Sequence, residues 1–189
     1  QNIIDLVEIS SLAEAQDFGD LSAATYFASG LSSSVRGVIS VGRESSFPGE
    51  IDYVTISSTG NGQDFGDLSH ARAPDAGGNS VRGIFSGGNN PSITATNTID
   101  FITIASTGDA QDFGDMIDGL GQVTGTSSPT RCVMASGESP SRINVMQYVT
   151  IMSMGNAFDF GDLTVARSGV CSFSSATRGL YLGGELPAS

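Results

Sequence analysis

One six-residue segment occurs four times in this chain at a nearly constant spacing. The copies are QDFGDL at 16–21 and 63–68, QDFGDM at 111–116 and FDFGDL at 158–163. Their central phenylalanines, Phe18, Phe65, Phe113 and Phe160, are separated by 47, 48 and 47 residues. A sequence period of roughly 20 to 50 residues is typical of solenoids, propellers and other arrays of one supersecondary unit. The spacing therefore predicts a repeat protein.

A strand pattern precedes each copy of this segment. Residues 4–10, 51–57, 99–105 and 146–152 alternate apolar and polar side chains, which is typical of a half-buried β-strand. A turn such as Ser58-Thr59-Gly60-Asn61-Gly62 then leads into the Asp-Phe-Gly-Asp segment. We expect that segment to be a short, irregular outer strand. Its phenylalanine and leucine would point inward, and its aspartates would face water or cap turns.

Two further strands complete each repeat. A stretch of small residues follows the Asp-Phe-Gly-Asp segment, and an apolar run between an arginine and a glycine comes next, at residues 36–42, 82–88, 131–137 and 178–184. An uninterrupted apolar run predicts a strand buried on both faces. Four strands in about 47 residues is the size of one propeller blade.

The sequence therefore predicts an all-β protein with a single repeat domain over residues 1–189. The repeat units are approximately 4–50, 51–98, 99–145 and 146–189. The first repeat starts at its alternating strand, and the last one ends after its arginine-to-glycine strand. We expect these two halves to combine into one blade, either within one chain or between two chains that share a larger ring, because closing a ring removes the exposed edges of an open sheet.

The repeat resembles kelch-type propeller repeats. Gly87-Gly88 after an apolar strand, Phe101 in the next strand, and Phe113 followed by Met116 occupy the places of the kelch pattern. Phenylalanine stands where kelch repeats usually have tryptophan, which this chain lacks. The resemblance implies a kelch-like β-propeller of four four-stranded repeats.

Over nearly its whole length the chain is also similar to repeat arrays in predicted structural or tail-fibre proteins of aquatic bacteriophages. The shared sequence segments are the Ile-Asp-Tyr-Val-Thr-Ile strand, the Asp-Phe-Gly-Asp-Leu segment, the Thr-Arg-Gly start of the apolar run and its Gly-Gly end. This similarity implies a role at the surface of a virion or outside the cell.

The charge balance excludes some partners. The chain has eight basic residues, all arginine, against 20 acidic residues, which gives a net charge of −12. Nucleic-acid binding relies on basic side chains that neutralise phosphates, so we expect no nucleic-acid partner and no anionic membrane surface. No apolar run reaches the ~18 residues of a membrane span, so we expect no membrane insertion. Residues 1–5 lack the pattern of a signal or transit peptide.

The paired aspartates of the repeated segment are candidate cation ligands. The pairs are Asp17/Asp20, Asp64/Asp67, Asp112/Asp115 and Asp159/Asp162. Ca²⁺ prefers carboxylate and carbonyl oxygens, but the spacing is not that of an EF-hand or of a glycine-rich calcium repeat. We expect the carboxylates to accept backbone N–H bonds at turns and predict no metal site, with Ca²⁺ as the minor alternative. The kinase Asp-Phe-Gly motif is excluded, because it occurs once and needs a strand lysine.

Other single residues favour structural roles. The repeated arginines Arg36, Arg82, Arg131 and Arg178 are expected to pair with aspartates of the repeat, with a sugar- or carboxylate-binding ring as the alternative. His70, the single histidine, with Ser69 and Asp75 would be an incomplete nucleophilic triad, so we predict no catalytic residue. Cys132 and Cys171 are expected to be small buried thiols rather than a disulfide. Five aromatic residues favour core positions over a sugar-stacking platform: Tyr26, Phe27, Phe85, Phe173 and Tyr181.

These observations favour a structural protein over an enzyme. We expect a non-enzymatic, adhesive protein, extracellular or on a virion surface, which assembles with copies of itself into a filament or decorates a larger fibre. The alternatives are a lectin-type propeller that binds cell-surface glycans and an extracellular lyase or hydrolase, because the fold alone does not decide between these classes. The loops at 43–50, 89–98 and 138–145 differ most between repeats, which disfavours a lectin site repeated in every blade.

Overall fold

The computed structural model describes residues 1–42 and 47–187, and in these ranges the protein is all-β with no helix. Part of the variable loop at 43–50 therefore lies outside the described residues. The strands form three four-stranded antiparallel sheets and two hairpins. The strands are β1 (Ile3–Leu6), β2 (Gln16–Asp20), β3 (Ser29–Ser32), β4 (Arg36–Ser40), β5 (Glu50–Thr55), β6 (Gln63–Asp67), β7 (Ala73–Gly78), β8 (Arg82–Asn89), β9 (Thr98–Thr103), β10 (Gln111–Asp115), β11 (Thr124–Ser127), β12 (Arg131–Ala135), β13 (Val145–Thr150), β14 (Phe158–Asp162), β15 (Cys171–Ser174) and β16 (Gly179–Leu182).

Each four-stranded sheet is a meander of consecutive strands. The first sheet is β3–β6, the second is β7–β10 and the third is β11–β14. The two central strands have the same register in all three sheets, with the leading arginine opposite a threonine: Arg36 with Thr55, Arg82 with Thr103 and Arg131 with Thr150. The prediction of an all-β fold with four strands per unit is confirmed.

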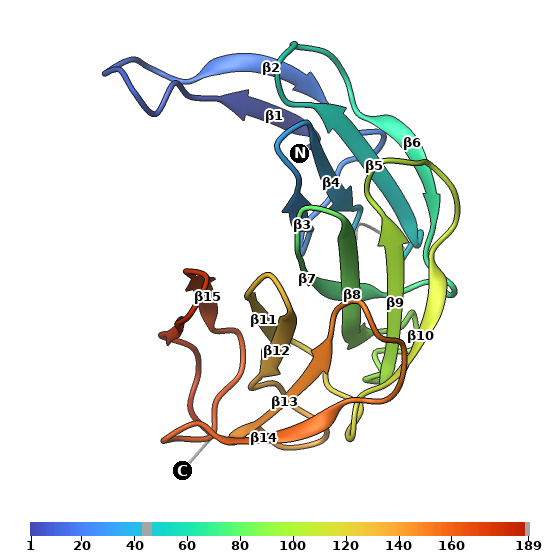
Figure 1. The fold of residues 1–189 in the computed structure, drawn as a ribbon, viewed down its shortest axis with the longest axis vertical. Helices are drawn as coiled ribbons and strands as arrows, with labels where there is room; N and C mark the ends of the chain where they lie inside the picture. The colour runs from blue at the N-terminus through green and yellow to red at the C-terminus, as the bar shows by residue number, and fades with distance from the viewer. Residues whose placement is uncertain (43–46, 188–189) are drawn as a thin grey trace.

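The sheets follow one another around an open arc (Figure 1). The Asp-Phe-Gly-Asp strands β2, β6, β10 and β14 run along its outer side, and the innermost strands contact one another in the order β3, β7, β11 and β15. The N-terminal hairpin, β1–β2, lies at one end of the arc, and the C-terminal hairpin, β15–β16, lies at the other. Strands β1 and β16 are not paired with each other within the described residues, so ring closure stays a prediction.

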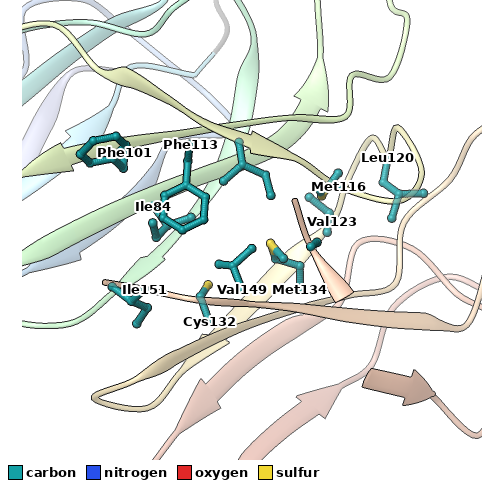
Figure 2. Packing of buried hydrophobic residues seen from close by; sticks show 12 residues of the cluster. Ile84, Phe101, Phe113, Met116, Leu120, Val123, Cys132, Met134, Val149 and Ile151 are labelled. Atoms are coloured by element: carbon teal, nitrogen blue, oxygen red, sulfur yellow. The ribbon is translucent and has the colours of Figure 1, made fainter. Parts of the chain in front are cut away.

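The hydrophobic core lies between neighbouring sheets. One cluster joins the first and second sheets and includes Phe65 and Phe85. The other cluster joins the second and third sheets, and Figure 2 shows Phe113 of β10 facing Val149 and Met134 of the third sheet. Burying one such side chain contributes about 1.5–3 kcal/mol. Because each cluster spans two sheets, packing between sheets holds the arc together.

Candidate assembly site at the sheet junctions

The glycine of the Asp-Phe-Gly-Asp strand is required by a close approach of the next sheet. In β6 the pairing passes from Gly66 to Asp64, so Phe65 is the extra residue of a β-bulge. A Cβ on Gly66 would lie 2.5 Å from the carbonyl carbon of Gly108 in the following turn. The same contact recurs at Gly19, where a Cβ would lie 2.4 Å from the Gly60 oxygen, and at Gly114 against Gly155. Only glycine leaves room for this contact.

Three hydrogen bonds accompany each of these contacts, and we call the group the sheet connector. Gly108 N–H donates to the Phe65 oxygen at 2.7 Å, and Ala110 N–H donates to the Asp67 oxygen at 2.8 Å. Asp67 N–H donates in turn to Asp109 Oδ1 at 3.1 Å. The equivalent bonds join Phe18, Asp20 and residues 60–62, and they join Phe113, Asp115 and residues 155–157. The repeated segment is therefore a backbone connector between sheets.

The sequence did not predict this connecting role. It did predict the inward phenylalanine, which is confirmed for Phe18, Phe65 and Phe113, whose exposed fractions are 7%, 2% and 2%. The sequence does contain one indication of the connector. The glycine of each Asp-Phe-Gly segment and the turn glycine of the following repeat are separated by a nearly constant number of residues.

The fourth copy of the motif lacks a following turn in the described residues. Phe160 is 46% exposed, so the expectation of an inward side chain is wrong there. No described atom lies within 4 Å of a Cβ placed on Gly161. The connector groups of β14 therefore face outward at the end of the arc.

The motif aspartates face water, as expected, and all eight are exposed. Among the described residues their expected turn-capping role is limited to Asp159, whose Oδ1 accepts the Gly161 N–H at 3.2 Å. Asp64 and Asp67 line a cleft of about 290 Å³ with Glu50, Asp52 and Ser22. Among the described residues no group of three or more His, Cys, Asp or Glu side chains is arranged to hold a metal ion.

Two of the repeated arginines, Arg36 and Arg82, form a second link between sheets. The expected pairing with aspartates is wrong for all four in the described residues. Arg36 Nη1 donates to the Ile104 oxygen of the second sheet at 3.0 Å, and Arg82 Nη1 donates to the Ile151 oxygen of the third sheet at 3.0 Å. Each guanidinium also lies over an aromatic ring of the adjacent strand, with Arg82 4.3 Å from the Phe101 centroid. Each of these two arginines is the first residue of its strand, β4 or β8. Its guanidinium therefore lies over the ring, and the hydrogen-bond acceptors within its reach there are backbone carbonyls of the next sheet.

The last two arginines of this series lack such an acceptor. Arg131 lies over Tyr148 at 4.6 Å, but its guanidinium makes no hydrogen bond within residues 1–42 and 47–187. The Arg178 guanidinium likewise has no partner in these ranges, and its backbone N–H bonds to Ser175 Oγ. Both side chains border a cleft of about 250 Å³ beside the C-terminal hairpin.

A buried ion pair stabilises the second sheet. Arg72 Nη1 donates to Asp100 Oδ2 at 2.8 Å, and both side chains are fully buried. Arg72 also donates to the Gly87 and Phe85 oxygens at 3.0 and 3.3 Å. Burial lowers the pKa of Arg72, while the carboxylate of Asp100 acts in the opposite direction. The sequence did not predict this pair, although an arginine recurs at the equivalent position, Arg167.

The Ser69-His70-Asp75 arrangement is not formed. His70 Nδ1 lies 3.2 Å from Ser69 Oγ, but that hydroxyl donates to Asp100 Oδ2 at 2.9 Å. The serine therefore contacts the carboxylate directly, whereas a catalytic triad places the histidine between them. Partial burial lowers the pKa of His70, and Arg72 adds to this shift.

The aromatic and cysteine predictions are partly correct. Phe85 is fully buried, and Tyr181 is half-buried with its hydroxyl donating to the Val133 oxygen at 2.9 Å. The core prediction is wrong for Tyr26, Phe27 and Phe173, which are 50%, 65% and 58% exposed.

Both cysteines are free thiols. Cys132 is buried as expected, and burial raises its pKa to about 12. Cys171 is exposed, so the prediction of a buried thiol is wrong there.

No protein-family model matches the chain, and no curated protein is similar to it. The resemblance to kelch repeats and to phage fibre arrays therefore stays a prediction. Residues 1–42 and 47–187 include no helix that is long and apolar enough to span a membrane.

Proposed function

We propose that this protein is a non-enzymatic structural and adhesive protein whose copies assemble into a filament or decorate a larger fibre. The observation that carries the proposal is the outward-facing connector of β14. Phe160, Gly161 and Asp162 have the same sequence as the connectors that join the other sheets, yet no turn lies against them in the described residues. A second protein surface of the same kind satisfies these groups.

Exposed apolar side chains at both ends of the arc support this proposal. Phe158, Leu180 and Leu182 at the C-terminal end are 63%, 52% and 45% exposed, and Val7 and Ile9 at the N-terminal end are 57% and 98% exposed. Unpaired strand edges are ready templates for pairing with another chain. Apolar side chains gathered at such edges mark an interaction surface.

The architecture that we propose is kelch-like, with each four-stranded sheet as one blade and the two hairpins as halves of a further blade. The proposed location is extracellular or on a virion surface, which the similarity to phage fibre arrays supports. A net charge of −12 keeps copies soluble until a specific contact overcomes their mutual repulsion.

Analytical ultracentrifugation of the purified chain over a range of concentrations tests the assembly. We expect species larger than the monomer, with filaments or rings in negative-stain electron microscopy. Phe160→Asp reduces assembly because it places a charge in the junction. Val81→Asp is the matched control, since Val81 is 52% exposed in a turn away from both ends. A monomer at every concentration contradicts the proposal.

A glycan-binding lectin is the second candidate, and the cleft beside the C-terminal hairpin favours it. Its lining combines hydroxyl groups of Ser127, Ser174 and Thr177 with Arg131 and the ring of Phe160, which are groups that bind sugars. A glycan array probed with the folded protein tests this candidate. Binding by a strictly monomeric protein favours the lectin over the structural protein.

A further inference from the structure

We propose that assembly is head to tail, with the C-terminal hairpin of one copy pairing edge to edge with the N-terminal hairpin of a second copy. Strands β15, β16, β1 and β2 then form a fourth sheet in the order of the other three. This inference rests on the proposed self-assembly and adds the partner surface and its register. Four independent features of the two ends carry it.

The first feature is the strand register. β16 has the sequence position of β4, β8 and β12, and β1 has that of β5, β9 and β13. The register common to the three sheets places Leu180 opposite Leu6 and Leu182 opposite Ile4. It also places Arg178 opposite Glu8, where the three sheets have threonine. The new pair therefore adds an attraction between opposite charges.

The second feature is a divided ion pair. Arg167 donates to the Tyr181 and Gly183 oxygens at 3.1 Å, as Arg72 donates to Phe85 and Gly87. Its Nε is buried and has no hydrogen-bond partner in the part of the chain that the structure describes. The equivalent of Asp100 in this fourth sheet is Asp5 of β1. A second copy therefore supplies the carboxylate that Arg167 lacks.

The residues at these two positions in the complete sheets agree with this assignment. The third sheet has Leu120 with Gln147, the first has Thr25 with Asp52, and the second has Arg72 with Asp100. The arginine at this position in the complete sheets therefore faces an aspartate. Asp5 of β1 gives Arg167 the same kind of partner.

The third feature is a complementarity of side-chain size. A residue of each innermost strand contacts a residue in the second strand of the following sheet, and one of the two is a glycine. A Cβ on Gly83 would lie 2.6 Å from Leu31 Cδ2, and a Cβ on Gly179 would lie 2.6 Å from Thr126 Oγ1. At the middle junction the glycine is on the other side, because a Cβ on Gly77 would lie 2.9 Å from the Sγ of Cys132. One glycine per pair keeps these contacts free of clashes.

The next pair in this series is Phe173 with Gly37. Phe173 is 58% exposed. A Cβ on Gly37 has only Val54 and Ile56 of its own sheet within 4 Å. The ring of Phe173 from one copy therefore has a complementary glycine in the first sheet of a second copy.

The fourth feature is the pair of arginines without acceptors. Continuing the Arg36–Ile104 and Arg82–Ile151 contacts by one repeat assigns the Ile9 oxygen to Arg131 and the Ile56 oxygen to Arg178. Both acceptors belong to the N-terminal part of the second copy. The cleft bordered by Arg131 and Arg178 is then the place that this second copy fills.

The open arc favours a second copy over closure within one chain. Figure 1 shows the two hairpins at separate ends of the arc. Sheet connectors hold β2 to the first sheet, and Ser172 Oγ and Tyr181 Oη bond the C-terminal hairpin to Gly125 and Val133 of the third sheet. Closure within one chain requires neighbouring sheets to rotate further relative to one another, which changes these contacts. Pairing with a second copy leaves the contacts between the sheets unchanged.

Disulfide trapping tests the register. In a Cys171→Ser background, Leu180→Cys and Leu6→Cys are prepared as separate proteins, mixed and oxidised. We expect a disulfide-linked heterodimer, at least about tenfold more abundant than with Leu180→Cys and Val7→Cys, because the Val7 side chain points to the opposite face of the strand. Circular dichroism of each variant verifies that it is folded.

The outcomes separate this inference from the proposed function. Assembly of the parent protein without the in-register disulfide overturns the head-to-tail pairing and leaves the self-assembly standing. A monomer throughout overturns both. A protein with both substitutions in one chain that forms an intramolecular disulfide and stays monomeric overturns the pairing in favour of closure within one chain.

Discussion

The backbone of Gly108 occupies the space that a side chain on Gly66 would need, since a Cβ there would lie 2.5 Å from the Gly108 carbonyl carbon. Two glycines from different repeats thus allow one strand to lie directly on the turn of the next sheet. With three hydrogen bonds around it, this contact converts a local sequence motif into a joint between sheets. The motif recurs because each joint requires it.

Substitution of Gly66 distinguishes the effect of the close contact between sheets from the effect of backbone strain at a positive φ. Both Gly66→Ala and Gly161→Ala place a side chain at a positive φ, +138° and +123°, but only the first meets another backbone. We expect Gly66→Ala to lower the free energy of unfolding by roughly 1–3 kcal/mol more than Gly161→Ala, because overpacking costs this much. Urea denaturation at low protein concentration measures the difference. Equal losses in the two variants would show that the close approach is not responsible.

The buried ion pair between Arg72 and Asp100 gives a second prediction, and the uncharged pair at the equivalent positions of the third sheet provides its control. Arg72→Leu leaves the carboxylate of Asp100 buried without its partner, which costs about 3–5 kcal/mol. The double variant Arg72→Leu with Asp100→Gln reproduces the Leu120 and Gln147 pair of the third sheet. We expect it to recover most of the loss in a urea titration. A double variant as unstable as the single one would contradict this interpretation.

Asp75 makes stability depend on pH. Its Oδ2 is buried without a hydrogen bond to any described residue. Burial raises the pKa of Asp75 to about 7, against the opposing effect of hydrogen bonds from the Gly125 and Ala76 amides. The folded state therefore keeps a proton that an unfolded chain, with an Asp pKa of about 3.9, has already lost. Between about pH 4 and pH 7 the unfolded state binds fewer protons, so the free energy of unfolding falls as pH rises, by at most about 1.4 kcal/mol per pH unit.

Thermal unfolding from pH 4 to pH 8 tests this linkage. We expect the Tm of Asp75→Asn to decline less with pH than that of the parent protein. Asp64→Asn, at an exposed position, serves as the control and keeps the parent slope. Parallel slopes for Asp75→Asn and the parent would exclude Asp75 as the cause.

The all-β architecture and its four-stranded sheets were predictable from the sequence because strand period and repeat phase are local signals. Residues 51–57 alternate, and residues 82–88 contain an apolar run between an arginine and a glycine, so strand type and order followed directly. The role of Gly66 was not predictable in this way, since it depends on a residue about one repeat away. The arginines were misassigned for a similar reason. Each repeat contains aspartates at a nearly constant phase to its arginine, but Arg36 lies at the end of its strand and reaches a carbonyl of the next sheet.

The exposed phenylalanines show that a repeated apolar pattern does not predict burial for the last repeat of the chain. Phe160 and Phe173 have the sequence of core residues, yet they lie at the C-terminal end of the arc, where no further sheet covers them in the described residues. A periodic sequence predicts the contacts of an interior repeat. It does not indicate which chain provides them for the last one.

A charge exchange between Asp5 and Arg167 tests the divided ion pair in solution. Asp5→Arg alone opposes two arginines at each junction, and Arg167→Asp alone opposes two aspartates, so we expect each variant to assemble at least about tenfold less than the parent. Mixed together, the two variants form one native and one exchanged junction. We therefore expect the mixture to recover assembly in light scattering. As a control, each variant alone at the total protein concentration of the mixture gives no recovery. Failure of the mixture to assemble, with both variants folded and the parent assembling, would refute the pairing of these two residues.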